Sequence, residues 1–135
     1  MASVSLVLLL AGCGTPPAAT AVTATAGIRR TLVQRSPAHE PGWETRLYLI
    51  EYPPGASAPA HVHPVNGVGW VIEGAFESRF DGEPMQRVEA GSGFVDRAEV
   101  PHLLFRNVSS DHVLRFMIAY TIRTEDEAVT PLNRQ

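Results

Sequence analysis

Large apolar residues recur along the chain in short alternating runs, which clusters of glycine, proline and small polar residues separate. In one run Trp43, Leu47 and Leu49 alternate with Glu44 and Arg46, the period of a β-strand with one buried face. Further strand-like runs cover residues 28–34, 69–76, 77–80, 84–88, 93–96, 103–105 and 112–122. No stretch keeps a helical period beyond about two turns. The pattern predicts an all-β sandwich or barrel of about eight to ten short strands.

Turn residues mark several strand boundaries. Asp81-Gly82 is a strong hairpin signal. Gly74 interrupts an apolar run and predicts a turn or a bulge there. Asn107 is expected to cap a turn through its side chain.

Length and charge narrow the classes of protein that the chain can represent. Its 135 residues allow one domain with a single core. The net charge is −3, and the eleven basic residues are arginines with no cluster beyond Arg29-Arg30. This distribution argues against a nucleic-acid partner and against a polybasic membrane motif. The single cysteine excludes an internal disulfide.

The first residues have the pattern of an export signal. Residues 4–10 are largely apolar but too few to span a bilayer, which needs about 20 residues. The tetrapeptide Leu10-Ala11-Gly12-Cys13 resembles the lipobox of bacterial lipoproteins, in which the cysteine is lipidated after cleavage. The resemblance implies a signal peptide at 1–12 and an exported protein, periplasmic or at the cell surface, that lipid on Cys13 anchors to the membrane.

Residues 13–27 then form the lipidated cysteine and a flexible tether, because they are poor in charge and in large apolar side chains. One feature departs from the lipoprotein pattern: no basic residue precedes the apolar run. The alternative is an N-terminal strand or disordered segment with a free thiol.

Two histidines, His61 and His63, stand two residues apart in a segment that Gly55 and Gly74 bound. In an extended segment both side chains point to one face, as two ligands of one metal ion must. The alternative is a chance H-x-H pair on a hydrated strand face.

This segment resembles the first motif of the cupin family, G-x5-H-x-H-x3,4-E-x6-G. Gly55, His61, His63 and Gly74 are in register, whereas Gly67 replaces the glutamate.

A second segment resembles the second cupin motif, G-x5-P-x-G-x2-H-x3-N. Gly91 and His102 match its spacing, Arg97 and Glu99 replace the proline and glycine, and Asn107 arrives one residue late. The chain is therefore similar to small single-domain cupins, in particular to an exported subgroup without the first-motif glutamate. The resemblance implies a double-stranded β-helix, or jelly-roll barrel, over residues 28–123, followed by a polar C-terminal tail at 124–135.

The resemblance also implies a metal site in the mouth of the barrel. His61, His63 and His102 would bind one divalent transition ion, with Fe, Mn, Zn, Ni and Cu all open. The alternative is a cupin that kept the fold and lost the ion. Asp96 is the candidate catalytic residue, either on the metal or as a proton acceptor beside it, and the alternative is an exposed strand-end residue. Glu99 is expected in a loop.

Several other residues are assigned structural roles. His39 falls in a turn and His112 opens the last strand. Gly67 is expected to widen the mouth of the barrel by lacking a side chain, and Gly69 adds room. Core or barrel-lining positions are expected for the aromatic residues Trp70, Phe94, Phe105 and Phe116.

Three functions remain open at this stage. The first is a metal-dependent oxygenase or isomerase acting on a small organic substrate. The second is a non-catalytic barrel that binds a small molecule at the cell surface, and the third is a purely structural domain. The family resemblance implies a homodimer, for which the apolar strand edge at residues 47–50 could pair between subunits. Fold alone does not decide among these functions.

Overall fold

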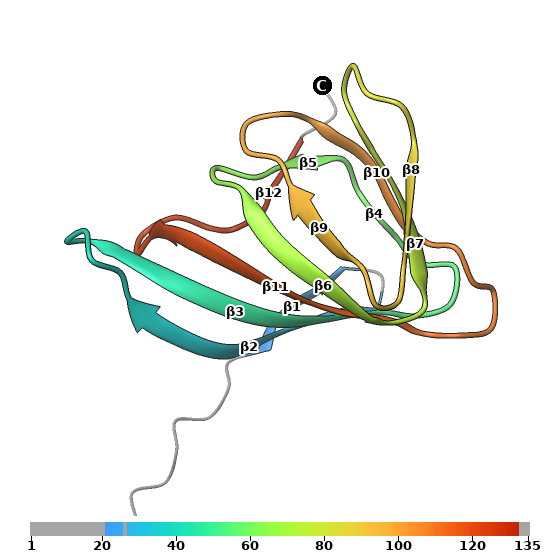
Figure 1. Ribbon diagram of the computed structural model, residues 1–135, viewed down its shortest axis with the longest axis horizontal. Coiled ribbons are helices and arrows are strands. Elements are labelled where there is room, and N and C mark those ends of the chain that lie inside the picture. The colour runs from blue at the N-terminus through green and yellow to red at the C-terminus, as the bar shows by residue number, and fades with distance from the viewer. Residues whose placement is uncertain (1–20, 26, 133–135) are drawn as a thin grey trace, which may run out of the picture.

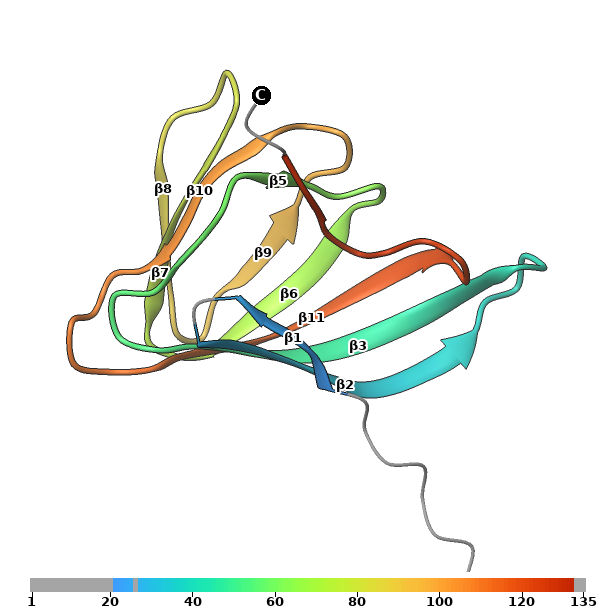
Figure 2. The same cartoon turned by 180° about the vertical axis from the view of Figure 1, so that it is seen from behind.

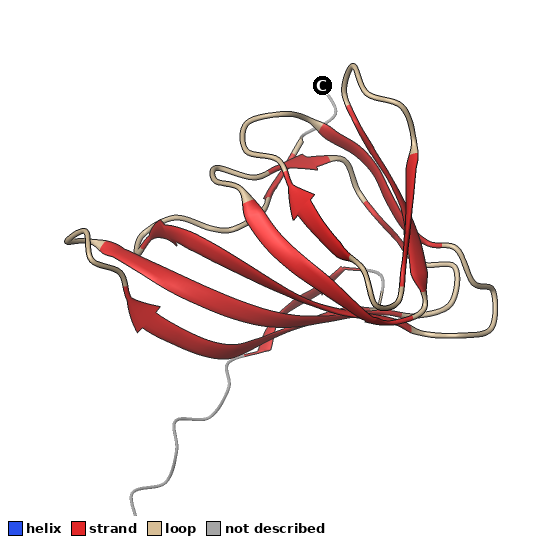
Figure 3. Ribbon diagram, viewed as in Figure 1, coloured by secondary structure: helices blue, strands red, loops and turns tan. Residues whose placement is uncertain are grey.

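The computed structural model describes residues 21–132 with the exception of residue 26. The predicted signal peptide and Cys13 lie outside the described residues. The described part consists of strands and loops (Figure 3), and it contains no helix long and apolar enough to cross a membrane. The strands are β1 Ala21–Thr25, β2 Ile28–Pro37, β3 Trp43–Tyr52, β4 Ser57–Ala58, β5 His61–Val62, β6 Gly67–Glu73, β7 Ala75–Phe80, β8 Gln86–Glu89, β9 Gly93–Asp96, β10 His102–Asn107, β11 Leu114–Arg123 and β12 Thr130–Pro131.

The strands form two antiparallel sheets that face each other (Figure 1). One sheet has the order β1-β2-β3-β11-β6-β9, and the other has the order β12-β5-β10-β7-β8 with β4 paired to β10. Seen from behind, β5 and β12 lie across from β3 and β11 (Figure 2). After β3 the chain passes back and forth between the two sheets, as in a jelly roll. The predicted all-β class and jelly-roll barrel are confirmed.

The core between the sheets is built on the inner faces of β3 and β11, which pair over their full lengths. The buried face of β3 is the one opposite to that of Trp43, Leu47 and Leu49. Its buried residues are Arg46, Tyr48, Ile50 and Tyr52. Aromatic rings from both sheets fill the centre, and Phe76 stacks on Phe105 with ring centroids 4.3 Å apart.

The inner face of β6 carries small residues because rings from neighbouring strands occupy the space. A Cβ at Gly67 would overlap the ring of Tyr120 and approach Ile118 Cδ1 to 2.8 Å, and one at Gly69 would overlap the ring of Phe94. The prediction that Gly67 and Gly69 widen the mouth is therefore wrong. The larger side chains of β6 point outward, and Trp70 is 54% exposed rather than part of the core.

Both ends of the predicted barrel extend further than the sequence pattern indicated. Residues 21–25, which the pattern placed in the tether, form β1 and pair with β2. In the predicted polar tail, β12 pairs with β5, and Ala128 is only 4% exposed. Both segments are held by backbone hydrogen bonds to β2 and β5, so they can join the sheets with few apolar side chains.

The turns follow their local chemistry. Gly74 and Gly82 have φ angles of 81° and 74°, which glycine adopts without steric cost. The side-chain amide of Asn107 donates to the carbonyls of Tyr52, Pro53 and His112, and its oxygen accepts from the Ser109 amide. The prediction that Asn107 caps a turn is thus confirmed.

Candidate metal centre

Three histidines from the same sheet meet inside the barrel. His61 in β5 is the register partner of His102 in β10, and His63 follows β5 and forms a bridge with Ala98. The three are 6%, 1% and 2% exposed, respectively. One ring nitrogen from each lies within 4.8 Å of the others. The structure thus brings together the three residues that the sequence predicted as ligands.

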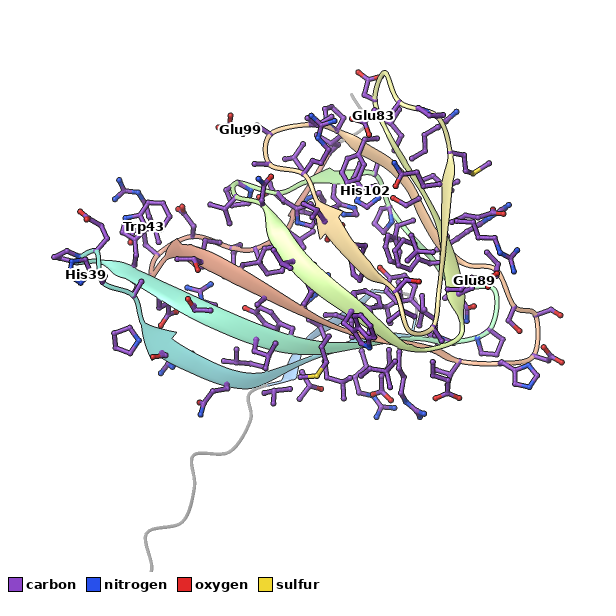
Figure 4. All side chains as sticks on the ribbon, viewed as in Figure 1. His39, Trp43, Glu83, Glu89, Glu99 and His102 are labelled. Atoms are coloured by element: carbon purple, nitrogen blue, oxygen red, sulfur yellow. The ribbon has the colours of Figure 1, made fainter. Side chains whose placement is uncertain are left out.

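The remaining histidines lie elsewhere. Figure 4 shows His102 between the sheets, whereas His39 lies far away at the β2–β3 turn, next to Trp43. His112 is exposed and contacts the carboxylate of Asp111. Glu99 is exposed in the loop between β9 and β10, as predicted.

Hydrogen bonds fix the protonation of two of the rings. His61 Nδ1 lies 2.8 Å from the carbonyl of Pro59, and His63 Nδ1 lies 2.8 Å from the carbonyl of Ala128. A carbonyl oxygen only accepts, so each Nδ1 carries the hydrogen, and in the neutral rings each Nε2 carries a lone pair. The two Nε2 atoms are 3.1 Å apart. Two lone pairs facing at this distance repel, and a cation between the rings would remove the repulsion.

The third ring has an unsatisfied nitrogen. His102 Nε2 lies 2.7 Å from the Ser78 hydroxyl, while His102 Nδ1 is buried without a hydrogen-bond partner among the described residues. A buried polar atom without a partner costs about 1–3 kcal/mol. Coordination of a metal through Nδ1 would satisfy it, and Nε2–H would then donate to Ser78. The three histidines therefore fit a divalent ion.

A carboxylate stands beside these nitrogens. Asp96 at the end of β9 is 6% exposed, and its Oδ2 lies 3.4 Å from His63 Nε2 and accepts a 3.0 Å hydrogen bond from the Tyr120 hydroxyl. Its Oδ1 lies 3.9 Å from His102 Nδ1. The exposed strand-end alternative for Asp96 is therefore wrong.

Asp96 lies beside Gly67, the position at which the cupin motif has its glutamate. Its register partner in β6 is Gly67, and the partner of Gly67 on the other side is Tyr120 in β11. The three residues form one row across three strands. The ring of Tyr120 passes over Gly67, and its hydroxyl reaches the carboxylate.

Burial sets the charges of the site. Desolvation lowers the pKa of His63 to about 4 and that of His102 to about 3, and it also lowers the pKa of His61. Desolvation raises the pKa of Asp96 to about 6, although the hydrogen bond from Tyr120 opposes this shift. The imidazoles are thus neutral at pH 7, the state in which histidine binds a metal.

These shifts predict that acid destabilises the metal-free protein. His63 and His102 bind protons near pH 6.5 in the unfolded chain but only near pH 4 and 3 in the folded one. The unfolded state therefore binds more protons in this window, and the free energy of unfolding falls as the pH falls from about 6.5 to 4. The pKa of Asp96 is raised from its ordinary 3.8 to about 6 in the folded protein, so between these pH values the folded state binds more protons at Asp96. This offsets part of the loss in the free energy of unfolding.

Denaturant unfolding of the chelator-treated protein at pH 7, 6, 5 and 4 measures this dependence. The double variant His63→Gln/His102→Gln is expected to show a shallower loss between pH 6.5 and 4. An equal slope in the variant would contradict the assignment.

The comparisons with known proteins agree with the fold. Residues 48–120 match the model of the cupin domain, and the chain belongs to this family. No curated protein matches significantly.

Among solved structures the chain resembles KdgF from Halomonas sp. at 24% identity, with a TM-score of 0.58, covering 78% of this chain and 90% of that one. It also resembles an RmlC-like cupin from Shewanella frigidimarina at 20% identity, with a TM-score of 0.61 and coverages of 83% and 91%. The DMSP lyase DddQ from Ruegeria pomeroyi is 21% identical, with a TM-score of 0.54 and coverages of 64% and 42%.

Some parts of the site carried no signal in the sequence. The carbonyl of Ala128 orients His63. Every residue has a backbone carbonyl, so the residue type at position 128 does not indicate this role. Ser78 and Tyr120 lie on strands β7 and β11, outside both motifs. These two residues can be recognised only when the sheets are known, because the sheets show which side chains of β7 and β11 face the interior.

Proposed function

We propose that this chain is a metal-binding cupin in which His61, His63 and His102 hold one divalent transition ion. The observation that carries the proposal is the pair of lone pairs facing each other at 3.1 Å between His61 and His63. The unpartnered, buried His102 Nδ1 supports it independently. Such an ion supplies Lewis acidity or a site for oxygen when bound.

We propose further that the protein is a metal-dependent oxygenase or isomerase acting on a small organic substrate. Asp96 is the catalytic candidate, because its carboxylate stands beside the ligand nitrogens and its raised pKa of about 6 suits transfer of a proton near neutral pH. Solved structures with this fold include an oxalate oxidase in complex with the substrate analogue glycolate and a DMSP lyase. The competing function is a barrel that binds a small molecule without turnover.

Titration of the full chain with Zn²⁺ tests the metal site. The protein would carry Cys13→Ser to prevent lipidation and would first be treated with a chelator. We expect uptake of about one ion per chain. Absence of uptake of Zn²⁺, Fe²⁺, Mn²⁺, Ni²⁺ and Cu²⁺ would sink the proposal and leave a barrel that binds its ligand unaided.

Export and anchoring remain proposals that rest on the lipobox. We propose that Cys13 is lipidated and holds the domain at the membrane, in the periplasm or at the cell surface. Mass spectrometry of the chain made in a bacterium should find a diacylglyceryl group on Cys13. An unmodified N-terminus beginning at Met1 would contradict this.

We also propose a homodimer, formed through a different surface from the one that the sequence indicated. The edges of β3 are paired on both sides, so residues 47–50 are not available for pairing. The outer faces of β6 and β9 instead carry exposed Val68, Trp70 and Val95. Val68 lies opposite Val95, and the half-buried Met117 of β11 lies opposite Trp70. A contiguous apolar patch of this kind is typical of a protein interface. Light scattering should give a dimer for the Cys13→Ser chain and a monomer after Trp70→Ser.

A further inference from the structure

Arg30 places a positive charge on the inner side of the barrel. It lies on β2 between Ile28, which belongs to the core, and Leu32, which packs against it. Its register partner in β3 is Ile50, which is 1% exposed. A charged group in such surroundings costs free energy unless something compensates its charge.

Other arginines of this protein show what such compensation looks like. The guanidinium of Arg46, which is also on an inner face, donates to the carboxylate of Glu44 and to the carbonyls of Arg123, Thr124 and Asp126. The neighbouring Arg29 points outward and pairs with Glu51.

Within the described part of the chain, Arg30 has no carboxylate or carbonyl partner. Arg35 and Arg79 share this lack, but both are exposed and hydrated, whereas Arg30 is half-buried.

Arg30 lines two cavities that lie next to each other. The inner one, of about 10 Å³, lies among the three histidines and Asp96. The outer one, of about 70 Å³, has mainly apolar walls that include Ala58 and Val129. Arg30, Tyr52 and His61 line both cavities. The guanidinium therefore stands where the outer cavity meets the candidate metal centre.

We propose that Arg30 binds the carboxylate of a small organic acid seated in the outer cavity. A guanidinium offers two parallel N–H donors, which match the two oxygens of a carboxylate. The apolar walls fit a short carbon skeleton, which inorganic phosphate lacks. A hydroxyl or keto oxygen next to the carboxylate would face the inner cavity. This last contact rests on the proposed metal site, whereas the contact with Arg30 does not.

The test uses L-lactate as the probe, with propane-1,2-diol as its uncharged analogue and inorganic phosphate as the competing anion. Calorimetric titrations are made on the Cys13→Ser chain loaded with Zn²⁺. We expect lactate to bind and the diol not to bind. Arg30→Gln should weaken lactate binding about tenfold or more, as expected for loss of a hydrogen bond to a charged group. The affinity of Arg30→Lys for lactate should lie between those of the parent protein and Arg30→Gln, because lysine keeps the charge but cannot make a bidentate contact.

Arg35→Gln is the matched control, because Arg35 lies exposed on the same strand, and it should bind lactate like the parent protein. Zn²⁺ uptake by Arg30→Gln shows that the variant is folded. If that variant fails to fold, Arg30→Lys carries the test alone. The proposal is overturned if lactate does not bind, if the arginine variants bind it as tightly as the parent, or if phosphate binds in its place.

The same titration on the chelator-treated protein separates this proposal from the proposed function. Weak lactate binding that still depends on Arg30 in the absence of zinc supports the carboxylate site on its own. Failure of the parent protein to take up any metal counts against the metal centre alone.

Discussion

Replacement of His61 and His63 together by alanine is expected to abolish metal binding. These rings contribute the two Nε2 atoms that lie 3.1 Å apart, and without them His102 is the only histidine left in the buried site. Loss of an outer hydrogen-bond partner of a ligand costs about 10- to 100-fold in affinity, so loss of two ligands should exceed about 100-fold. Elemental analysis after Zn²⁺ loading measures the stoichiometry, and thermal unfolding with and without zinc measures the stabilisation by the ion.

The control is the double variant His39→Ala/His112→Ala, which removes the same number of imidazoles from exposed positions. It should take up zinc and gain thermal stability like the parent protein. Zinc uptake by His61→Ala/His63→Ala equal to that of the parent protein would show that the metal is bound elsewhere and would rule out the buried site. Without metal, His61→Ala/His63→Ala should remain folded, because the repulsion between the two rings is also removed.

Gly67→Ala is expected to destabilise the fold by about 1–3 kcal/mol, the usual cost of overpacking a core. The added methyl group would overlap the ring of Tyr120, which cannot move away because it is buried and hydrogen-bonded to Asp96. For the same reason, Gly67→Glu should not restore the glutamate of the cupin motif as a ligand. Denaturant unfolding measures the change.

The matched control is Gly93→Ala on the adjacent strand β9. A Cβ there meets nothing closer than the carbonyl oxygen of Gly69 at 3.6 Å, and its backbone does not have a positive φ. Its stability should be equal to that of the parent or slightly higher, since alanine loses less backbone entropy than glycine. Equal losses in the two variants would show that the row of Tyr120, Gly67 and Asp96 is not tightly packed.

Much of the fold could be predicted from the sequence because alternation and turn residues are local signals. They gave the all-β class and the hairpin at Asp81-Gly82. The direction in which each strand faces was harder to predict. In β6 the more hydrophobic phase, which contains Val68 and Trp70, points outward. Two of the three inner positions, 67 and 69, are glycines because Tyr120 and Phe94 occupy that space. Which residue fills a gap depends on partners that are far away in sequence.

Some residues of the candidate site could likewise be predicted from the sequence, and others could not. His61 and His63 were identified from their spacing, and the resemblance to the cupin motifs added His102 and Asp96. Arg30 was not identified, because an arginine in an alternating run looks like a solvent-exposed residue until the inner face of β2 is known. The carbonyl groups that orient His61 and His63 belong to Pro59 and Ala128, and no pattern of side chains can reveal a backbone acceptor.

The hydrogen bond from His63 to the carbonyl of Ala128 bears on the order of events during biosynthesis. The acceptor that orients the ring of His63 lies 65 residues further along the chain, and the strand β12, which pairs with β5, follows that acceptor, so both are made well after the histidines. A nascent chain therefore holds two correctly spaced histidines without a finished site. Metal would therefore be acquired only after this later segment has been made and has folded onto β5.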